Sequence, residues 1–198
     1  TAQGTLLTYQ FAANSFADVD IIHGDSLTYS ASGNPAWFVF TPGTRTFSGT
    51  PGALDVGGPY NIVVRATDSQ GAFVEDTFTL TVTNINDNPV LSAPLADQNA
   101  TEDVVFSYAA GASFSDVDVP LYDTLTYSVS AIPAWLTFNT STGAFSGTPT
   151  NADVTSAPIS ITVRATDTFG LFAEDTFDLV VTNVNDAPTL AVALVDQT

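Results

Sequence analysis

The chain contains the same sequence twice. FADVD at 16–20 returns as FSDVD at 114–118, and VRATD at 64–68 returns unchanged at 163–167. The spacing between the copies is roughly 100 residues, which is the length of one independently folding module and far longer than a solenoid repeat. The 198 residues therefore predict two copies of one domain, and any residue can be weighed by whether the other copy keeps it.

Each copy alternates apolar and polar residues with a period of two. The runs LTYSVS at 125–130, ISITVRAT at 159–166 and TFDLVVT at 176–182 are rich in Thr, Val and Ile, which is typical of half-buried strands. Clusters of Gly, Pro, Asn and Asp separate such runs at short intervals. The pattern predicts an all-β fold of two tandem Greek-key β-sandwich domains, with about seven strands each.

The domain boundaries follow from the motif NxNDxP, which closes the copies at 84–89 and 183–188. Its proline is expected to end the last strand and stiffen the joint. We therefore expect domain 1 at residues 1–87, domain 2 at 88–186, and the opening strand of a following repeat at 187–198.

Domain 2 opens with the strand-like segment Val90–Gln98, which has no counterpart in domain 1 because Thr1 aligns with Asn99. The missing counterpart is found at Thr189–Gln197. We therefore expect the sequence to lie within a longer array, with domain 1 lacking its first strand. One hypothesis is that Thr189–Gln197 completes domain 1 of another molecule by strand addition, which would give head-to-tail self-association. The alternative is an unpaired tail and a domain that tolerates the missing edge strand.

The charge balance separates the possible partners. The chain has 21 Asp and Glu against 3 Lys and Arg, for a net charge of −18. Nucleic acid and anionic membranes are very poor partners because phosphate binding needs a basic face, whereas bound cations would relieve the repulsion within each domain. No apolar run is long enough for membrane insertion by this segment. The absence of Cys excludes disulfides and thiolate metal sites.

The acidic residues cluster where loops are expected to meet. Asp116 and Asp118 follow an early strand, Asp167 follows the strand ending VRAT, and Asn86 and Asp87 lie in the linker before domain 2. Loops after alternate strands gather at one end of a sandwich, so these oxygens are expected to converge near the linker. Ca²⁺ requires a cluster of roughly six to eight oxygen ligands, and carboxylate repulsion would keep the joint loose without the ion.

Each acidic pair also has a simpler interpretation, because Asp and Asn in loops often hydrogen-bond their own backbone. Asp25 and Asp123 recur as well, but each precedes a strand, which favours a role in shaping a turn. An EF-hand is excluded, because DVDIIHGD and DVDVPLYD lack the third acid, the Gly and the terminal Glu at the required spacing. Recurrence at matched positions, together with the linker motif, favours a metal site.

These motifs resemble those of cadherin repeats. NxNDxP after a terminal strand resembles the cadherin linker motif DxNDNxP, DVD resembles DxD, and ATDSQG and ATDTFG resemble AxDxG. The remaining sequence, with PAWLTFN at 133–139 and TGAFSGTP at 142–149, is similar to the dystroglycan-type cadherin-like repeats of exported bacterial proteins. The resemblance covers nearly the whole chain. It implies Ig-like, cadherin-like domains that hold Ca²⁺ at the linker between them.

The resemblance also implies a set of metal ligands. One complete junction would use Asp55, Asn86, Asp87, Asp116, Asp118 and Asp167. Half of a junction with a preceding domain would use Asp18, Asp20 and Asp68, and half of one with a following domain would use Glu102, Asn185 and Asp186. Asp55 is a poor match to the family motif, and domain 1 has Gly4 where domain 2 has Glu102. These departures indicate fewer ions at the internal junction than a full cadherin joint would hold.

Catalysis has few candidate residues. His23 is the only histidine, and domain 2 has Leu121 in its place, so no Ser–His–Asp set recurs. A pair of carboxylates acting as a glycosidase is the less favoured alternative, because the acids lie at a domain joint. Trp37 and Trp135 raise the possibility of carbohydrate binding, but a Trp before an alternating strand in both copies is more typical of core packing.

The sequence therefore predicts a non-enzymatic pair of calcium-binding repeats from an exported or cell-surface protein of bacterial origin. The repeats are expected to be rigidified by Ca²⁺ at the linker and to serve adhesion to protein or polysaccharide, with neighbouring repeats of the same protein as partners. The alternative function is a carbohydrate-binding module or a passive spacer attached to a secreted polysaccharide-degrading enzyme.

Overall fold

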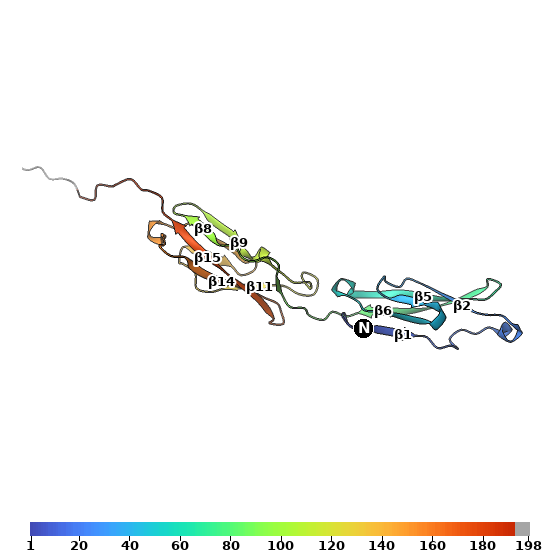
Figure 1. Cartoon of the computed structure of the whole chain (residues 1–198). Coiled ribbons are helices and arrows are strands. Elements are labelled where there is room, and N and C mark those ends of the chain that lie inside the picture. The colour runs from blue at the N-terminus through green and yellow to red at the C-terminus, as the bar shows by residue number, and fades with distance from the viewer. Residues whose placement is uncertain (193–198) are drawn as a thin grey trace, which may run out of the picture. The chain divides into compact units, whose positions relative to one another are not determined.

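A computed structural model describes residues 1–192, and the chain divides into two units, Thr1–Asn86 and Asp87–Thr198. Within the described residues, both units are built from strands and short 3₁₀ helices, without an α-helix (Figure 1). The predicted all-β sandwich class is confirmed. A search of the same residues for a helix long and apolar enough to cross a membrane finds none.

Unit 1 consists of two three-stranded antiparallel sheets. β4 lies between β1 and β3 in one sheet, and β5 lies between β2 and β6 in the other. The strands are β1 (Leu7–Gln10), β2 (Thr28–Ser32), β3 (Val39–Thr41), β4 (Thr46–Gly49), β5 (Gly57–Thr67) and β6 (Phe73–Val82). The 3₁₀ helices are η1 (Val19–His23), η2 (Pro42–Thr44) and η3 (Ala53–Asp55).

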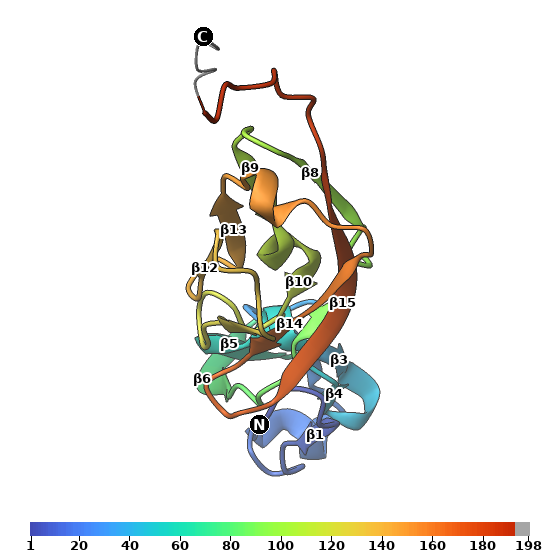
Figure 2. The ribbon, with the colours of Figure 1, turned by 90° about the vertical axis from the view of Figure 1, so that its left-hand side faces the viewer.

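Unit 2 repeats both sheets and adds strands to them. β13 lies between β12 and β9, and the second sheet has the order β11-β14-β15-β8. Figure 2 shows β8 running beside β15, with which it pairs in parallel. The strands are β7 (Val90–Leu91), β8 (Gln98–Thr101), β9 (Phe106–Ala109), β10 (Phe114–Ser115), β11 (Thr126–Val129), β12 (Leu136–Asn139), β13 (Ala144–Gly147), β14 (Ile159–Thr166) and β15 (Phe172–Thr182). The 3₁₀ helices are η4 (Ala110–Ser113) and η5 (Asn151–Asp153).

The inward-facing residues of the alternating strands form the two cores. Alternate residues are buried at 161, 163 and 165 in β14 and at 177, 179 and 181 in β15, as expected of strands with one solvent face. Phe47 of unit 1 and Phe145 of unit 2 occupy matching positions, at 0% and 1% exposure. Because each core is apolar and continuous, each sandwich can hold its loops at fixed positions.

The tryptophans belong to these cores. Trp37 and Trp135 pack against the buried cluster of their own unit, which supports the packing interpretation over a sugar-stacking one. The glycine of the recurring FSGTP run explains how they fit. A Cβ at Gly49 or Gly147 would collide with the backbone carbonyl of Trp37 or Trp135, so only glycine allows the two chains to approach this closely.

The units differ in the segment before the first strand that they share, which is β1 in unit 1 and β9 in unit 2. In unit 2, β7 pairs with β10, and β8 extends the sheet of β15. In unit 1 the corresponding edge of β6 is met by residues 1–3, through a parallel bridge between Ala2 and Thr83 and backbone hydrogen bonds of Thr1 and Gln3. Residues 187–192 form no strand. The rest of the predicted opening strand, 193–198, lies outside the described residues.

Candidate metal centre

Each unit brings three aspartates together at one end of its sandwich. In unit 2, Asp116 follows β10, Asp123 precedes β11, and Asp167 follows β14. The antiparallel register pairs Thr126 with Thr166, so the loops that carry Asp123 and Asp167 leave the sheet side by side. Carboxylate oxygens of all three residues lie within 4.8 Å of one another. We call this set the unit-2 triad.

Backbone amides hold the unit-2 triad in place through one oxygen of each carboxylate. Asp116 Oδ1 accepts the Asp118 N–H at 2.8 Å. Asp123 Oδ1 accepts the N–H groups of Thr124 at 2.6 Å and Thr168 at 3.0 Å. Asp123 thus ties its own turn to the loop of Asp167, and its orientation is set by both.

Asp167 is fixed in the same way by its own turn. Its Oδ1 accepts the N–H of Phe169 at 2.9 Å and that of Leu171 at 2.7 Å. The sequence TDTFG therefore folds as a tight turn around the carboxylate, as expected of an Asp that caps its own backbone. The same turn that satisfies these two N–H groups also places the Asp167 carboxylate in the triad.

The second oxygens of two triad members have no protein partner. Asp116 and Asp123 are 8% and 5% exposed, and the Oδ2 atom of each is buried without a hydrogen bond. Buried carboxylate oxygens almost always have a partner in proteins, so two in one cluster require an explanation. A bound cation would provide one, and a hard, all-oxygen donor set of this kind fits Ca²⁺ rather than a softer transition metal. The residues present therefore fit a calcium ion.

The electrostatics of the triad favour a cation as well. Burial raises the pKa of the Asp116 carboxyl, and the nearby carboxylates of Asp118, Asp123 and Asp167 raise it further against the opposing hydrogen bond from Asp118. Burial also acts to raise the pKa of Asp123, but its hydrogen bonds from Thr168 and Thr124 together lower it. The charge that Asp123 keeps therefore adds to the repulsion on a charged Asp116. A bound cation would neutralise this repulsion.

Unit 1 contains a matching set, Asp18, Asp25 and Asp68, which we call the unit-1 triad. Its carboxylate oxygens also lie within 4.8 Å of one another, but all three residues are only half-buried. Asp18 Oδ1 accepts the Asp20 N–H at 2.8 Å, in the position of Asp116 with Asp118.

The other two members of the unit-1 triad repeat their counterparts too. Asp25 Oδ1 accepts the N–H groups of Ser26 at 2.6 Å and Ser69 at 3.0 Å. Hydrogen bonds from Ser69 and Ser26 lower the pKa of Asp25. Asp68 Oδ1 accepts two amides of its own turn at 2.8 Å each. The arrangement is therefore a property of the repeat and not of one copy.

Asp118, the second acid of the DxD pair, lies beside the unit-2 triad but outside it. It is 2% exposed, and its Oδ2 accepts the N–H of Asp87 at 2.7 Å. This bond fastens the first residue of unit 2 to the loop that carries the triad. Its unit-1 counterpart Asp20 is exposed within η1.

A third acidic group lies at the opposite end of unit 2. Glu102 is 1% exposed, and its Oε2 accepts the Val184 N–H at 3.0 Å, while Oε1 is buried without a hydrogen bond. Carboxylate oxygens of Asp103 and Asp186 lie within 4.8 Å of Glu102 and of each other. The predicted ligands Glu102 and Asp186 are thus brought together. Asn185 donates from Nδ2 to the backbone oxygen of Asp186 at 3.3 Å.

The remaining predicted ligands, Asp55 and Asn86, belong to unit 1. Asp55 lies at the end of η3, where its Oδ2 accepts the N–H of Gly52 at 2.8 Å and closes that turn. Whether these two residues join a site with unit 2 stays a prediction.

Sequence reasoning assigned Asp25 and Asp123 to turns and did not count them as ligands. The structure places both in the triads, where each bridges two loops. The available signal was their recurrence at matched positions, each followed by Ser or Thr. Neither the alternation of apolar residues nor the short motifs could show that the loop after β14 would donate a second backbone N–H to Asp123.

Each unit consists of packed, mainly antiparallel sheets with acidic loops at one end. Both units therefore belong to the class of Ig-like β-sandwich domains. The chain belongs to the family described as "Putative Ig domain", whose model matches residues 1–83 and 88–182. The finer assignment to dystroglycan-type repeats stays a prediction.

Part of a bacterial adhesin is similar in sequence. The serine-rich adhesin for platelets of Staphylococcus aureus (strain MRSA252) is 27% identical over 161 residues, which cover 79% of this chain and 11% of the adhesin. The chain thus spans about a tenth of the length of that relative.

Two cadherin ectodomain structures share the fold. Protocadherin gammaB7 EC3–6 matches 79% of this chain and 41% of its own, with 20% identity and a TM-score of 0.53. Mouse cadherin-23 EC22–24 matches 80% of this chain and 53% of its own, with 18% identity and a TM-score of 0.51. At these identities the likeness shows an Ig-like, cadherin-like fold and nothing further.

Proposed function

We propose that the chain is a pair of calcium-binding, adhesion-type Ig-like repeats of an exported or cell-surface protein. The observation that carries the proposal is the pair of buried carboxylate oxygens on Asp116 and Asp123 that have no hydrogen-bond partner. Asp116, Asp123 and Asp167 would hold the ion, which would neutralise their mutual repulsion. The unit-1 triad would hold a second, weaker ion, because its residues are half-buried.

The linker gives the ion a mechanical role in this proposal. Asp118 is two residues from Asp116 and binds the Asp87 amide, so fixing the triad would also fix the start of unit 2. Asn86 and Asp55 would then add oxygens from unit 1, and calcium would stiffen the joint. Glu102, Asn185 and Asp186 would play the corresponding part toward a following repeat.

The adhesive part of the proposal is supported by the resemblance to part of an adhesin and by the fold it shares with cadherin ectodomains. We place the protein outside the cell for the same reason. Its partners would be neighbouring repeats, a protein surface or a polysaccharide. Catalysis is not proposed, because His23 is exposed in η1 and has no counterpart in unit 2.

A carbohydrate-binding module or a passive spacer beside a secreted polysaccharide-degrading enzyme is the alternative. The packing of Trp37 and Trp135 against the cores removes the two residues best suited to stack on sugars. A spacer would share the fold but would not need buried, unpartnered carboxylates.

Calcium calorimetry on the whole chain tests the proposal. We expect saturable binding with a Kd of about 10⁻³ M or tighter, as in other extracellular calcium modules. Asp116→Asn together with Asp123→Asn should abolish the tighter site. The matched control, Glu75→Gln with Glu174→Gln, removes the same charge outside the triads and should leave the tighter site intact. Equal loss in both variants would indicate diffuse counterion binding and refute the proposal.

The stiffening is tested separately by small-angle scattering. The maximum dimension of the wild-type chain should become longer or better defined when calcium replaces chelator, because a fixed linker samples fewer conformations. The Asp116→Asn, Asp123→Asn chain should show no such change. If the wild type binds calcium without any change in its maximum dimension, the calcium site would stand but its mechanical role would be refuted.

A further inference from the structure

A hollow in unit 2 lies beside the unit-2 triad, and we call it the triad pocket. Its volume is about 490 Å³, which is within the range of about 300–1,000 Å³ for pockets that hold small ligands. Asp116 belongs both to the triad and to the residues that line the pocket. The pocket and the candidate metal centre therefore share a carboxylate.

Apolar side chains form the buried side of the triad pocket. Phe114 is a member of the core of unit 2, and Leu125 and Tyr127 are half-buried against the same core. The rings of Phe114 and Tyr127 lie 6.2 Å apart in an edge-to-face arrangement. A ligand in the pocket would thus meet a packed surface on one side, as is usual in small-molecule sites.

Hydroxyl groups form the exposed side of the triad pocket. Ser115, Thr124 and Ser141 all line it, and all three are exposed. The N–H of Thr124 donates to Asp123 Oδ1 at 2.6 Å, and that of Ser141 donates to Asn139 Oδ1 at 2.9 Å. Ser115 lies in strand β10. The three hydroxyl groups are therefore presented by loops and a strand whose backbones are fixed.

The charge of the triad pocket selects among ligands. Asp116 is the charged residue among those that line it, and the arginines at 45, 65 and 164 are not among them. A divalent ion held by three carboxylates would leave one negative charge in excess. An anionic ligand would therefore find no basic group to pair with, whereas a neutral ligand rich in hydroxyl groups could both donate and accept hydrogen bonds.

Two residues of the triad pocket have raised pKa values. Burial raises the pKa of the Tyr127 phenol, and it also raises the pKa of the Asp116 carboxyl. Asp116 Oδ2 is buried without a hydrogen bond. Perturbed pKa values gather at functional sites, and a pocket that combines them with a few polar groups is the natural candidate for ligand binding.

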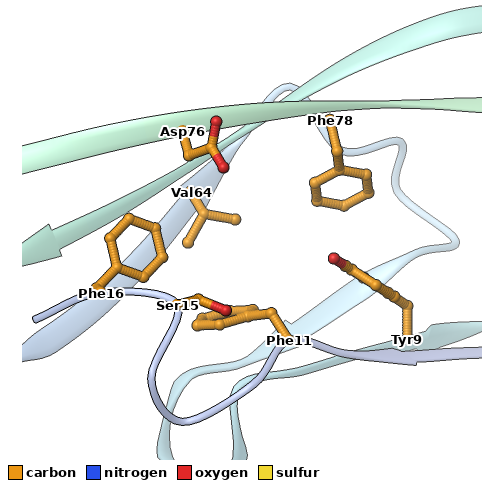
Figure 3. A pocket seen from close by; sticks show the side chains of 7 residues that line it. All are labelled: Tyr9, Phe11, Ser15, Phe16, Val64, Asp76 and Phe78. Carbon is orange, nitrogen blue, oxygen red and sulfur yellow. The ribbon is translucent and has the colours of Figure 1, made fainter.

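Unit 1 differs at the matching positions. Ala17 and Gly43 stand where unit 2 has Ser115 and Ser141, so two of the three hydroxyl groups are missing there. Figure 3 shows a hollow of another kind in unit 1, where aromatic rings surround the space and no triad residue lines it. The pairing of hydroxyl groups with a buried triad is thus a feature of unit 2.

We propose that the triad pocket binds a neutral saccharide, whose adjacent hydroxyl groups complete the coordination of calcium at the unit-2 triad. This inference rests on the proposed calcium site and names its ligand. Each triad member offers one carboxylate oxygen to the cluster, and Ca²⁺ takes about six to eight, so positions remain for sugar oxygens. The sugar ring packs on the apolar side of the pocket, and its other hydroxyl groups bond to Ser115, Thr124 and Ser141.

Calorimetry of the whole chain with galactose, glucose and mannose is the first test. In saturating calcium, at least one should bind with a Kd of about 1 mM, as expected of so small a ligand. Chelator should weaken this binding at least about tenfold, and the uronate of the same sugar should bind more weakly than the neutral form. Sugar binding that chelator leaves unchanged, or a uronate that binds more tightly, would overturn the proposal.

The same titrations separate this inference from the calcium site. If calcium binds but none of the three sugars does, the saccharide site is refuted and the calcium site stands. If calcium itself does not bind, the proposed function is refuted. Retention of the chain on a gel of the corresponding neutral polysaccharide would assign the sugar to a polymer, and binding of the monosaccharide without retention would assign it to a free sugar.

A pair of serine variants tests the place of the site. Ser115→Ala with Ser141→Gly introduces the residues of unit 1 and should weaken sugar binding at least about fivefold through two lost hydrogen bonds. The Kd for calcium should not change, which also shows that unit 2 is folded. The matched control, Ser107→Ala with Ser146→Ala, removes two exposed hydroxyl groups outside the pocket and should bind like the wild type. Equal loss in both variants would overturn the assignment to the triad pocket.

Discussion

The two acidic triads have the same hydrogen bonds but different burial. Asp18, Asp25 and Asp68 are half-buried, whereas Asp116, Asp123 and Asp167 are all buried. The loops that carry them share their aspartates but differ between them, with IIHG at 21–24 and VPLY at 119–122.

Contacts with the start of unit 2 also surround the unit-2 triad. In unit 2, Asp87 binds Asp118 through its amide, and β7 pairs with β10 next to Asp116. These residues lie next to the loop that carries Asp116. The comparison teaches that a motif sets the orientation of a carboxylate, while the burial of that carboxylate sets how unfavourable its charge is without a cation.

The largest expected effect is that Asp116→Asn changes the stability of unit 2 in opposite directions without and with calcium. Without calcium, Asp116→Asn should stabilise unit 2, because burial and three neighbouring carboxylates raise the pKa of Asp116 and make its charge unfavourable. With calcium at about 100 times its Kd, the wild type should gain about 2.7 kcal/mol, and the variant should lose most of it. Thermal unfolding with and without chelator measures both. The matched variant Asp18→Asn should show a smaller change in each condition, and an equal change would contradict the comparison.

Substitutions of the glycines that contact the tryptophans should, in contrast, destabilise both units by similar amounts. Gly147→Ala and Gly49→Ala each force a Cβ against a Trp backbone carbonyl, so each should cost its own unit about 1–3 kcal/mol. Urea unfolding measures the cost. Gly43→Ala is the control, because no atom lies within 4 Å of the added Cβ, and it should be neutral or slightly stabilising.

Alkaline pH should affect unit 2 through Tyr108. Burial raises the pKa of this phenol, and the charge of Asp175 adds to the effect against a hydrogen bond from Ala96. The folded state thus keeps a proton that the unfolded state releases near pH 10. The stabilising contribution should be complete below that pH and be lost as pH rises through the folded-state pKa. Tyr108→Phe should remove this part of the pH dependence, and an unchanged profile would contradict it.

The smallest effects should come from the exposed ion pairs. Arg65 with Glu75 and Arg164 with Glu174 are joined at 2.7 and 2.8 Å with more than 40% of each side chain exposed. Each guanidinium also lies 3.9 Å from the ring of Phe73 or Phe172. Double-mutant cycles should give a coupling of about 0.2–1 kcal/mol in both units. A much larger coupling in one unit would indicate that these surfaces are not equivalent.

Much of the fold was predictable because it depends on local signals. Period-two runs such as 159–166 became the strands expected, since one buried face is enough to specify a strand. Asp116 and Asp167 were also expected to meet, because both follow strands that end on the same side.

Other features depend on contacts between distant segments and could not be predicted. Asp123 bonds to its own turn and to Thr168, and only the second bond makes it a triad member.

The central claim is that the unit-2 triad is a built calcium site and that its half-buried counterpart in unit 1 is a weaker one. A calcium titration followed by NMR of the whole chain tests it most directly. We predict that the amides of Asp118 and Thr168 saturate first, and that those of Asp20 and Ser69 follow at higher calcium concentration. Simultaneous saturation of both sets, or shifts spread over all acidic residues without saturation, would contradict the claim.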